Sequence, residues 1–489
     1  MNTVNRKWMT LSVTSLGALL SALNFSTLII ALPDLITGLH ASLLQAMWIM
    51  LAYMVAQTVA VLMAGSLADR FGRKRLYMFG LIVFTIFSFT SGFAPNAPML
   101  ILFRVLQGIG GAMVMANSTA IVADAFPREE LGRALGINIM VVAVGQIIGP
   151  VLGGWLTTAY GWEWTFWFNI PFGVIAILWG MWAMGMKDVK RAGETKKFDM
   201  LGSVLYVIFM TGLLLGLTWG PIQQWNSPVV YISFLAFVIA FPLFLRVENG
   251  HPSALLHLPL FKNIVFSLGI VTATLNGLAR MAVMFMLIFY FQGALSYDAL
   301  MAGILTIPLA AGMLIFSPLA GWLGDRYGET TPATAGIIFS FIGLVGLAMD
   351  TGLHTPYWQL AFWMTLISIG SGLFNSPNSS SIMNAAGPKY RGEASGIRSL
   401  TANLGMMLSV AFTIPLVTQS IPREAMLAIF SGTQVGLENP EQSLSGFITG
   451  LHTVFWVMAA LMVAACFLSI MRAGRTVKHE AGVNGVTPQ

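Results

Sequence analysis

Three arginines lie within long apolar stretches of this sequence, where charged side chains are rare. Arg104 is followed one helical turn later by Gln107, Arg280 is preceded one turn earlier by Asn276, and Arg398 lies near the start of a further apolar stretch. A cation in hydrocarbon is costly, so it normally faces the interior of a helix bundle and contacts a polar partner. These five residues are therefore candidates for a polar translocation pathway. Alternatively, Arg104 could snorkel to an interface, and Arg280 and Arg398 could bond backbone carbonyls and only hold helices together.

The acidic residues have the opposite distribution, because all of them lie outside the apolar stretches or at their ends. The pathway is thus predicted to be neutral to positive. An exporter of lipophilic dications needs an embedded carboxylate, since an unpaired cation is unfavourable at low dielectric. We therefore expect neutral, zwitterionic or anionic amphiphiles as substrates. Candidates for a proton-exchanging group are Asp34, Asp124 and Glu393. The plainer explanations are a solvated loop edge for Asp34 and pairing with nearby basic residues for Asp124 and Glu393.

Residues 375–381 are polar or helix-breaking within an otherwise apolar stretch. Such a segment faces protein or water rather than lipid. Asn375 and Asn378 are therefore predicted to line a polar cavity wall or a gate.

A short charged segment occurs twice. Residues 65–75 contain Asp69 and Arg70 between two glycines, followed by Arg73. Residues 321–328 repeat the pattern with Asp325 and Arg326, and the two aspartates are 256 positions apart. A carboxylate at a helix end can pair with a basic residue or a helix N-terminus of a neighbouring bundle in one conformation and release it in another. These five residues are predicted to form a conformational gate. The alternative is that the charges only orient the chain in a membrane.

One apolar stretch carries regularly spaced glycines together with a proline. Small residues four apart on a helix form a smooth face that a second helix can approach closely, and a proline removes one backbone donor. The residues of this predicted packing face are Gly145, Gly149, Pro150, Gly153 and Gly154.

The composition places all of these groups in a membrane protein. The 489-residue chain is 56% hydrophobic and 9% charged, with a mean hydropathy of +0.78, whereas soluble domains are about 25% charged. Fourteen apolar stretches are long enough to cross a bilayer as helices, namely 9–33, 46–68, 76–94, 98–122, 134–157, 164–186, 200–219, 228–245, 264–292, 299–323, 332–350, 357–384, 394–419 and 446–471. The basic residues cluster in alternate connecting segments, which predicts that both termini are cytoplasmic and explains the net charge of +6 without nucleic-acid binding. The one cysteine, Cys466, excludes a disulfide framework.

The spacing of the repeated segment predicts two six-helix bundles with two helices inserted between them. The predicted division is residues 1–186 for the first bundle, 187–263 for the inserted helices with their linkers, 264–471 for the second bundle and 472–489 for a cytoplasmic tail. No P-loop, HExxH, CxxC or GxSxG motif is found. We therefore expect no enzymatic activity, no catalytic residues, no metal site and no cofactor.

These segments resemble the major facilitator superfamily, and the GPxxGG element ending at Gly154 resembles its antiporter signature. The number of stretches, together with residues 161–171, resembles the drug:proton antiporter branch of EmrB- and QacA-type exporters. The resemblance covers essentially the whole chain and implies two six-helix bundles around a central cavity that work by alternating access. The chain departs from the family pattern at Glu163, where arginine is usual. It also departs at Asn24, where the family has a carboxylate for proton coupling and cation recognition. Asparagine neither titrates nor carries charge.

The sequence therefore predicts an all-α polytopic transporter in a prokaryotic plasma membrane. It would export small amphipathic molecules, driven by an ion gradient, with protons as the expected ion. Its partners would be the lipid bilayer and the substrate, and we expect a functional monomer. An uncoupled facilitator or uptake carrier for a neutral or anionic metabolite or lipid is the alternative that Asn24 favours. A non-transporting membrane sensor or lipid-handling partner is less compatible with the repeated gate segments.

Overall fold

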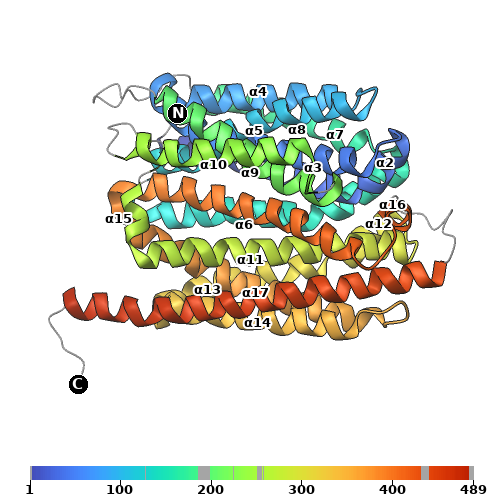
Figure 1. Cartoon of the computed structure of the whole chain (residues 1–489). Coiled ribbons are helices and arrows are strands. Elements are labelled where there is room, and N and C mark those ends of the chain that lie inside the picture. The colour runs from blue at the N-terminus through green and yellow to red at the C-terminus, as the bar shows by residue number, and fades with distance from the viewer. Residues whose placement is uncertain are drawn as a thin grey trace. The chain divides into compact units, whose positions relative to one another are not determined.

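The computed structural model describes residues 3–126, 128–184, 199–223, 225–249, 256, 258–430 and 440–483. Within these residues the chain forms helices and no strands (Figure 1). Twelve helices in this part of the chain are long and apolar enough to cross a membrane. The predicted all-α, polytopic fold class is therefore confirmed.

The number of spans is not confirmed as fourteen. Two of the predicted spans, 76–94 and 357–384, are helical but are not among the twelve. The first coincides with α4 (Arg73–Ser91), which begins with three basic residues. The second is the start of α15 (Tyr357–Thr418), where polar side chains lower the hydropathy. Fourteen spans stay a prediction.

The structure divides into two compact units. Unit 1 comprises Met1–Leu255, Ile288–Leu305 and Leu427–Gly436. Within it, α3 and α4 both pack on α5, α1 packs on α6, and α9 packs on α10 (Figure 1). Its helices are α1 (Thr3–Ile30), α2 (Leu32–Gly38), α3 (Leu43–Phe71), α4, α5 (Ala97–Ala125), α6 (Arg128–Tyr160), α7 (Trp164–Trp167), α8 (Asn169–Met184), α9 (Met200–Gln223), α10 (Pro228–Glu248), the π-helical turn η2 (Tyr290–Ala294) and α12 (Ala299–Leu305).

Unit 2 comprises Leu256–Leu287, Thr306–Met426 and Leu437–Gln489. In this unit α15 packs against α13, α14 and α17, and α14 also packs against α17. The 62-residue α15 is two helices joined at Gly387, whose φ of 73° is not helical. Its helices are the 3-10 turn η1 (Leu258–Lys262), most of α11 (Ile264–Phe289), α13 (Pro308–Tyr327), α14 (Thr330–Asp350), α15, the start of α16 (Arg423–Phe430) and α17 (Pro440–Val483). The predicted domain boundaries at residues 187, 264 and 472 stay predictions.

Local sequence accounts for the ends of several helices. Ser42 and Gln45 form a reciprocal capping box at the start of α3, and the side chain of Asn96 accepts from the backbone at the start of α5. The two copies of the repeated segment also share a turn. Gly72 and Gly328 both have positive φ, 97° and 82°, which glycine adopts without the penalty that a Cβ atom incurs.

Two basic side chains bind the C-terminal end of α8. Arg6 Nη2 and Lys74 Nζ both donate to the carbonyl oxygen of Met184, at 3.2 Å and 3.0 Å. The last carbonyls of a helix lack intrahelical partners and carry partial negative charge, so cations stabilise this end. These contacts tie α1 and α4 to α8.

Candidate functional site

Arg104 lies at the centre of a polar network inside unit 1. Its side chain on α5 is fully buried, as are those of Asn24 on α1 and Gln107 on α5. Arg104 Nε donates to the carbonyl oxygen of Ile49 at 3.1 Å, and Nη1 donates to Asn24 Oδ1 at 3.2 Å and to Gln107 Oε1 at 2.6 Å. Gln107 Nε2 donates to Asn24 Oδ1 at 3.2 Å and to Ser88 Oγ at 2.6 Å. These five residues are referred to below as the Arg104 network.

Aromatic rings complete the surroundings of this cation. The guanidinium carbon of Arg104 lies 4.5 Å from the ring centroid of Tyr53 and 5.7 Å from that of Phe166. The quadrupole of an aromatic ring attracts a cation over its face. In the described part of the chain, Arg104 contacts no Asp or Glu side chain. The network therefore holds a buried positive charge with neutral partners.

Two donors of the Arg104 network have no hydrogen-bond partner among the described residues, namely Arg104 Nη2 and Asn24 Nδ2. A buried donor without a partner costs about 1–3 kcal/mol. Both atoms are N–H donors, so the complementary group is an acceptor, and an anionic oxygen binds such donors most strongly. The network therefore disfavours a cationic substrate nearby and can donate to a neutral acceptor or an anion.

The glycines of the predicted packing face lie where helices approach closely. A Cβ at Gly153 would lie 2.6 Å from the carbonyl oxygen of Thr27 on α1, and one at Gly149 would lie 2.5 Å from Ser26 Cβ. Gly145 faces α1 as well, whereas Gly154 faces α12. On the side of α6 that faces α12, the carbonyl oxygen of Pro150 lies against Gly303. Close approach at all these points excludes larger side chains.

The predicted gate is only partly described. The side chains of Asp69, Arg70 and Asp325 lie outside the described residues. Arg73 Nη1 forms an ion pair with Asp124 Oδ2 at 3.0 Å, which joins the start of α4 to the end of α5. Arg326 is exposed, and its guanidinium lies over the rings of Trp322 and Tyr327, whose centroids are 5.6 Å and 5.5 Å away.

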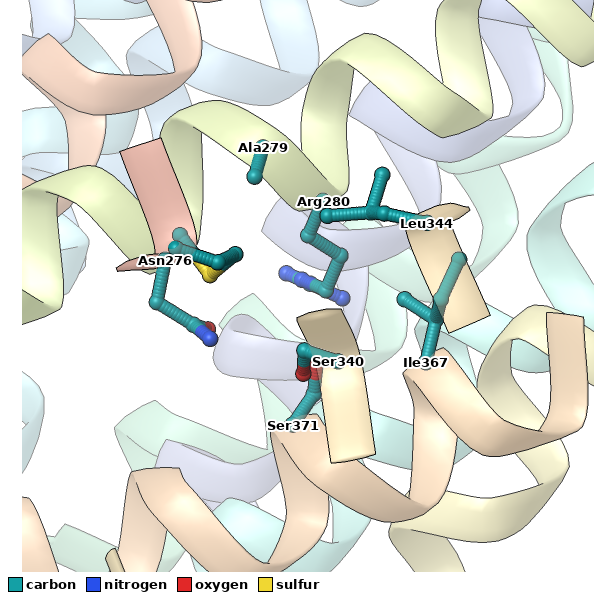
Figure 2. Close-up of a pocket in the computed structure, with 8 residues that line it drawn as sticks. Asn276, Ala279, Arg280, Ser340, Leu344, Ile367 and Ser371 are labelled. Carbon is teal, nitrogen blue, oxygen red and sulfur yellow. The ribbon is translucent and has the colours of Figure 1, made fainter. Parts of the chain in front are cut away.

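In unit 2, Arg280 and Asn276 of α11 line a narrow cavity. The cavity is too narrow in this conformation to admit a water molecule, and it is also lined by Ser340, Ser371, Leu344 and Met462. Figure 2 shows the guanidinium of Arg280 and the amide of Asn276 extending from α11 toward the side where Ser340 and Ser371 lie. Arg280 Nη1 is also 3.7 Å from Met313 Sδ. Drug-sized pockets usually have 300–1,000 Å³, so this cavity is too small for a drug-like molecule.

Asn378, predicted to line a polar cavity wall or a gate, forms hydrogen bonds with two neighbouring helices in this conformation. It is buried, it accepts a hydrogen bond from Arg472 Nη1 of α17, and its Nδ2 donates to the carbonyl oxygen of Gly269 on α11 at 3.1 Å. The polar side chain therefore joins three helices of unit 2. Asn375 is half-buried on α15, and Arg398 is partly buried further along the same helix.

The three candidates for proton exchange lie in different surroundings. Asp34 is exposed in the first turn of α2. Loss of hydration nevertheless raises the pKa of its carboxyl, and a backbone hydrogen bond opposes this rise. Asp124 is paired with Arg73, and Glu393 is exposed on α15. This shift moves the pKa of Asp34 toward neutral pH.

Several residues at these sites were not predicted from the sequence. Ser88 belongs to the Arg104 network and Tyr53 contacts it. Ser340 and Ser371 line the Arg280 cavity. Arg472 is fully buried, although it follows an apolar stretch where a solvated charge is usual. Single serines and tyrosines on apolar helices carry no distinguishing pattern. Only the proximity of an arginine in three dimensions distinguishes them.

Comparison with known proteins identifies the group of proteins that this chain resembles. The profile of the Major Facilitator Superfamily matches residues 14–410. The riboflavin transporter RibZ of Clostridioides difficile is 30% identical over 475 residues, which cover 97% of this chain and 99% of that protein. The tetracenomycin C resistance and export protein of Streptomyces glaucescens is 27% identical, with 95% and 91% covered. The methylenomycin A resistance protein of Bacillus subtilis is 30% identical, with 82% and 86% covered.

A solved structure shares the fold. An auto-inhibited peptide transporter of the POT family matches 95% of this chain and 97% of its own, with a TM-score of 0.62 and 16% sequence identity. At this identity the similarity concerns the fold alone.

Proposed function

The chain belongs to the Major Facilitator Superfamily, and from this premise we propose that it is a secondary active transporter that exports amphipathic, drug-like molecules. Export would cross the plasma membrane of a prokaryotic cell by alternating access, driven by a proton gradient and without a cofactor. Membership of the fourteen-span drug:proton antiporter branch, cytoplasmic termini and a functional monomer belong to the same proposal.

The named relatives support the export part of the proposal. Two of them carry names that specify resistance to an antibiotic, one of which also specifies export, and each covers more than four fifths of this chain. Coverage of this extent means that the similarity extends over most of the chain rather than over one segment. A shared fold alone would not support a shared substrate class.

The Arg104 network carries the proposal about substrate charge. It places a buried guanidinium and two donors without partners among the described residues at the point where the family pattern has a carboxylate. The described spans contain acidic residues only at their ends. A multivalent cation would meet repulsion and no counter-ion, whereas a neutral, zwitterionic or anionic amphiphile would find donors.

A second candidate function is an uncoupled facilitator or uptake carrier for a neutral or anionic metabolite or lipid. Asn24 supports it, because the amide cannot exchange a proton with the transport cycle. Similarity to a protein named as a riboflavin transporter also supports it. The two candidates differ in whether transport of the substrate needs an energised membrane.

The test is efflux from a bacterial host that lacks its own exporters, with and without a protonophore. The strains carry wild type, Asn24→Asp, Asn249→Asp or an empty vector, at matched membrane levels. Asn249 is exposed at the end of α10, so its change to aspartate is a matched control for the added charge. The substrates are sets of three dyes of similar size, one anionic, one neutral and one dicationic.

Protonophore-sensitive efflux of neutral or anionic dyes by wild type and Asn249→Asp supports the exporter. Downhill flux that the protonophore leaves unchanged supports the facilitator instead. If Asn24→Asp alone exports, or alone accepts dications, the native chain is a carrier of uncharged or anionic molecules. Preference of wild type for dications over matched anions contradicts the proposed substrate class.

A further inference from the structure

The Arg280 cavity contains two buried hydroxyls that bond to nothing in the described structure. Ser340 on α14 is 3% exposed and Ser371 on α15 is 1% exposed, and the Oγ atom of each has no hydrogen-bond partner among the described residues. Two buried threonines of unit 2, Thr272 and Thr413, donate to the carbonyl one turn earlier in their own helix, at 2.9 Å and 2.6 Å. Ser340 and Ser371 instead line a shared cavity (Figure 2).

An unsatisfied buried hydroxyl requires an explanation, and a small bound species is one. The polar groups that line the cavity are the Arg280 guanidinium, the Asn276 amide and the two hydroxyls, and all of them can donate. None of the residues that line it is an Asp or Glu. The lining therefore complements a negative charge, and an occupant that presents a positive charge is excluded.

We propose that the Arg280 cavity is a binding site for a small monovalent anion, with Ser340 and Ser371 as its hydroxyl donors and Arg280 as its cation. The site lies wholly within unit 2, between α11, α14, α15 and α17. The occupant is either free chloride or the carboxylate group of a transported molecule. The second source rests on the proposed function, and the first does not.

The dimensions restrict the occupant. In this conformation the lining side chains leave no room for a water molecule, so an anion enters only when a flexible lining side chain moves. Met462 is suited to this movement, because methionine has three rotatable bonds and no branch. A bulky anion such as gluconate is excluded, and this exclusion supplies the reference salt for a binding measurement.

The first experiment measures thermal unfolding of the purified full chain as chloride replaces gluconate at constant ionic strength. An anion that binds the folded state raises the melting temperature with concentration. We expect this rise for wild type, and an apparent chloride affinity lower by about tenfold in Ser340→Ala and in Ser371→Ala, the loss of one hydrogen bond to a charged group. Ser409→Ala is the matched control, because Ser409 is also buried on α15 without a partner for its Oγ, but it does not line the cavity.

Two outcomes overturn the proposal. The first is a melting temperature of wild type that does not respond to chloride or to carboxylates, which indicates a dry cavity or bound water. The second is an affinity in Ser340→Ala and Ser371→Ala that matches that of Ser409→Ala, which places the anion elsewhere. Because each change removes a single oxygen atom, two independent variants guard against the misfolding of one.

A second arm identifies the source of the anion. Decanoate is compared with decanol, its uncharged counterpart, in the absence and presence of chloride. If decanoate raises the melting temperature and weakens the chloride response, while decanol does neither, the site accepts the carboxylate of an amphiphile. If only chloride acts, the site is an ion site. The chloride response is measurable even when the chain exports no dye, so the failure of this inference is distinct from the failure of the proposed export.

Discussion

Replacing Arg104 tests whether its buried charge destabilises or stabilises the fold. Arg104→Lys keeps the charge, but a lysine ammonium lacks the planar fork that reaches Ile49, Asn24 and Gln107 together. Arg104→Met removes the charge and keeps an unbranched side chain of similar length. We expect the lysine variant to be the less stable of the two, although lysine is the closer chemical relative.

The hydrogen bonds set the size of the difference. If lysine retains one of the three acceptors, two charge-assisted hydrogen bonds are lost, at about 1.5–3 kcal/mol each, while the charge stays buried. This sums to roughly 3–6 kcal/mol. Methionine leaves one acceptor without a donor, Gln107 Oε1, because Asn24 Oδ1 still accepts from Gln107 Nε2 and the Ile49 carbonyl lies within α3, where the backbone ladder supplies a donor. That costs about 1–3 kcal/mol, and the variant no longer has to dehydrate a cation, which costs several kcal/mol.

The assay is the fraction of each purified variant that stays monodisperse by size-exclusion chromatography after heating in detergent. Ser88→Ala serves as a control, because it removes a peripheral hydrogen bond at 2.6 Å and leaves the cation intact. We expect the order wild type, Ser88→Ala, Arg104→Met, Arg104→Lys from most to least stable. If the methionine variant is as unstable as the lysine variant or more so, the view of Arg104 as a cation without a counter-ion is wrong.

Three further predictions concern other parts of the chain. Gly153→Ala should lower thermal stability, because its Cβ would lie 2.6 Å from the α1 backbone. Gly65→Ala is the control, because a Cβ there has nothing within 4 Å, and it should be neutral or stabilise α3 by up to about 1 kcal/mol. Equal effects of the two substitutions would refute the close packing at Gly153. A double-mutant cycle on Arg73 and Asp124, whose side chains are 26% and 47% exposed, should give a coupling energy below about 1 kcal/mol that decreases with salt, and a salt-independent coupling would contradict this. The pKa of Asp34 is raised in the folded chain, so the stability that its protonated form supplies is present at low pH and is lost as pH rises through that pKa. Asp34→Asn should remove this small pH dependence from thermal unfolding, and an unchanged profile would assign it to another group.

The helices were the most predictable part of the fold, because long apolar stretches can only be helical in a bilayer. The stretch predicted at 98–122 corresponds to α5, Ala97–Ala125. The stretch predicted at 299–323 is instead divided into α12 and α13, and the division falls immediately before Pro308. Ile307, the residue before the proline, keeps helical backbone angles, but Pro308 has no N–H to donate to the preceding turn, so the apolar pattern continues where the helical hydrogen bonding is interrupted.

The candidate sites were predictable only as far as local spacing reaches. Arg104 and Gln107 are three residues apart, so their contact follows from helix geometry. Their contact with Asn24, 80 residues away from Arg104, does not follow from spacing, and the resemblance to the family was what drew attention to that position. The contact of Asn378 could not be predicted from local spacing, because its partner Arg472 lies 94 residues further along the chain. Polar residues in an apolar stretch indicate a buried partner, but the pattern does not tell whether that partner is a substrate or another helix.

The cap on α8 has a consequence for how the chain is made. Arg6 is 178 residues and Lys74 is 110 residues away from the carbonyl of Met184 that both of them bind. Arg6 and Lys74 are synthesised long before Met184. Their contact with the carbonyl oxygen of Met184 can therefore form only after α8 has been made. The order of synthesis therefore makes this contact one of the later ones to form in unit 1. A chain that stops before Met184 would lack the contact that joins α1 and α4 to α8.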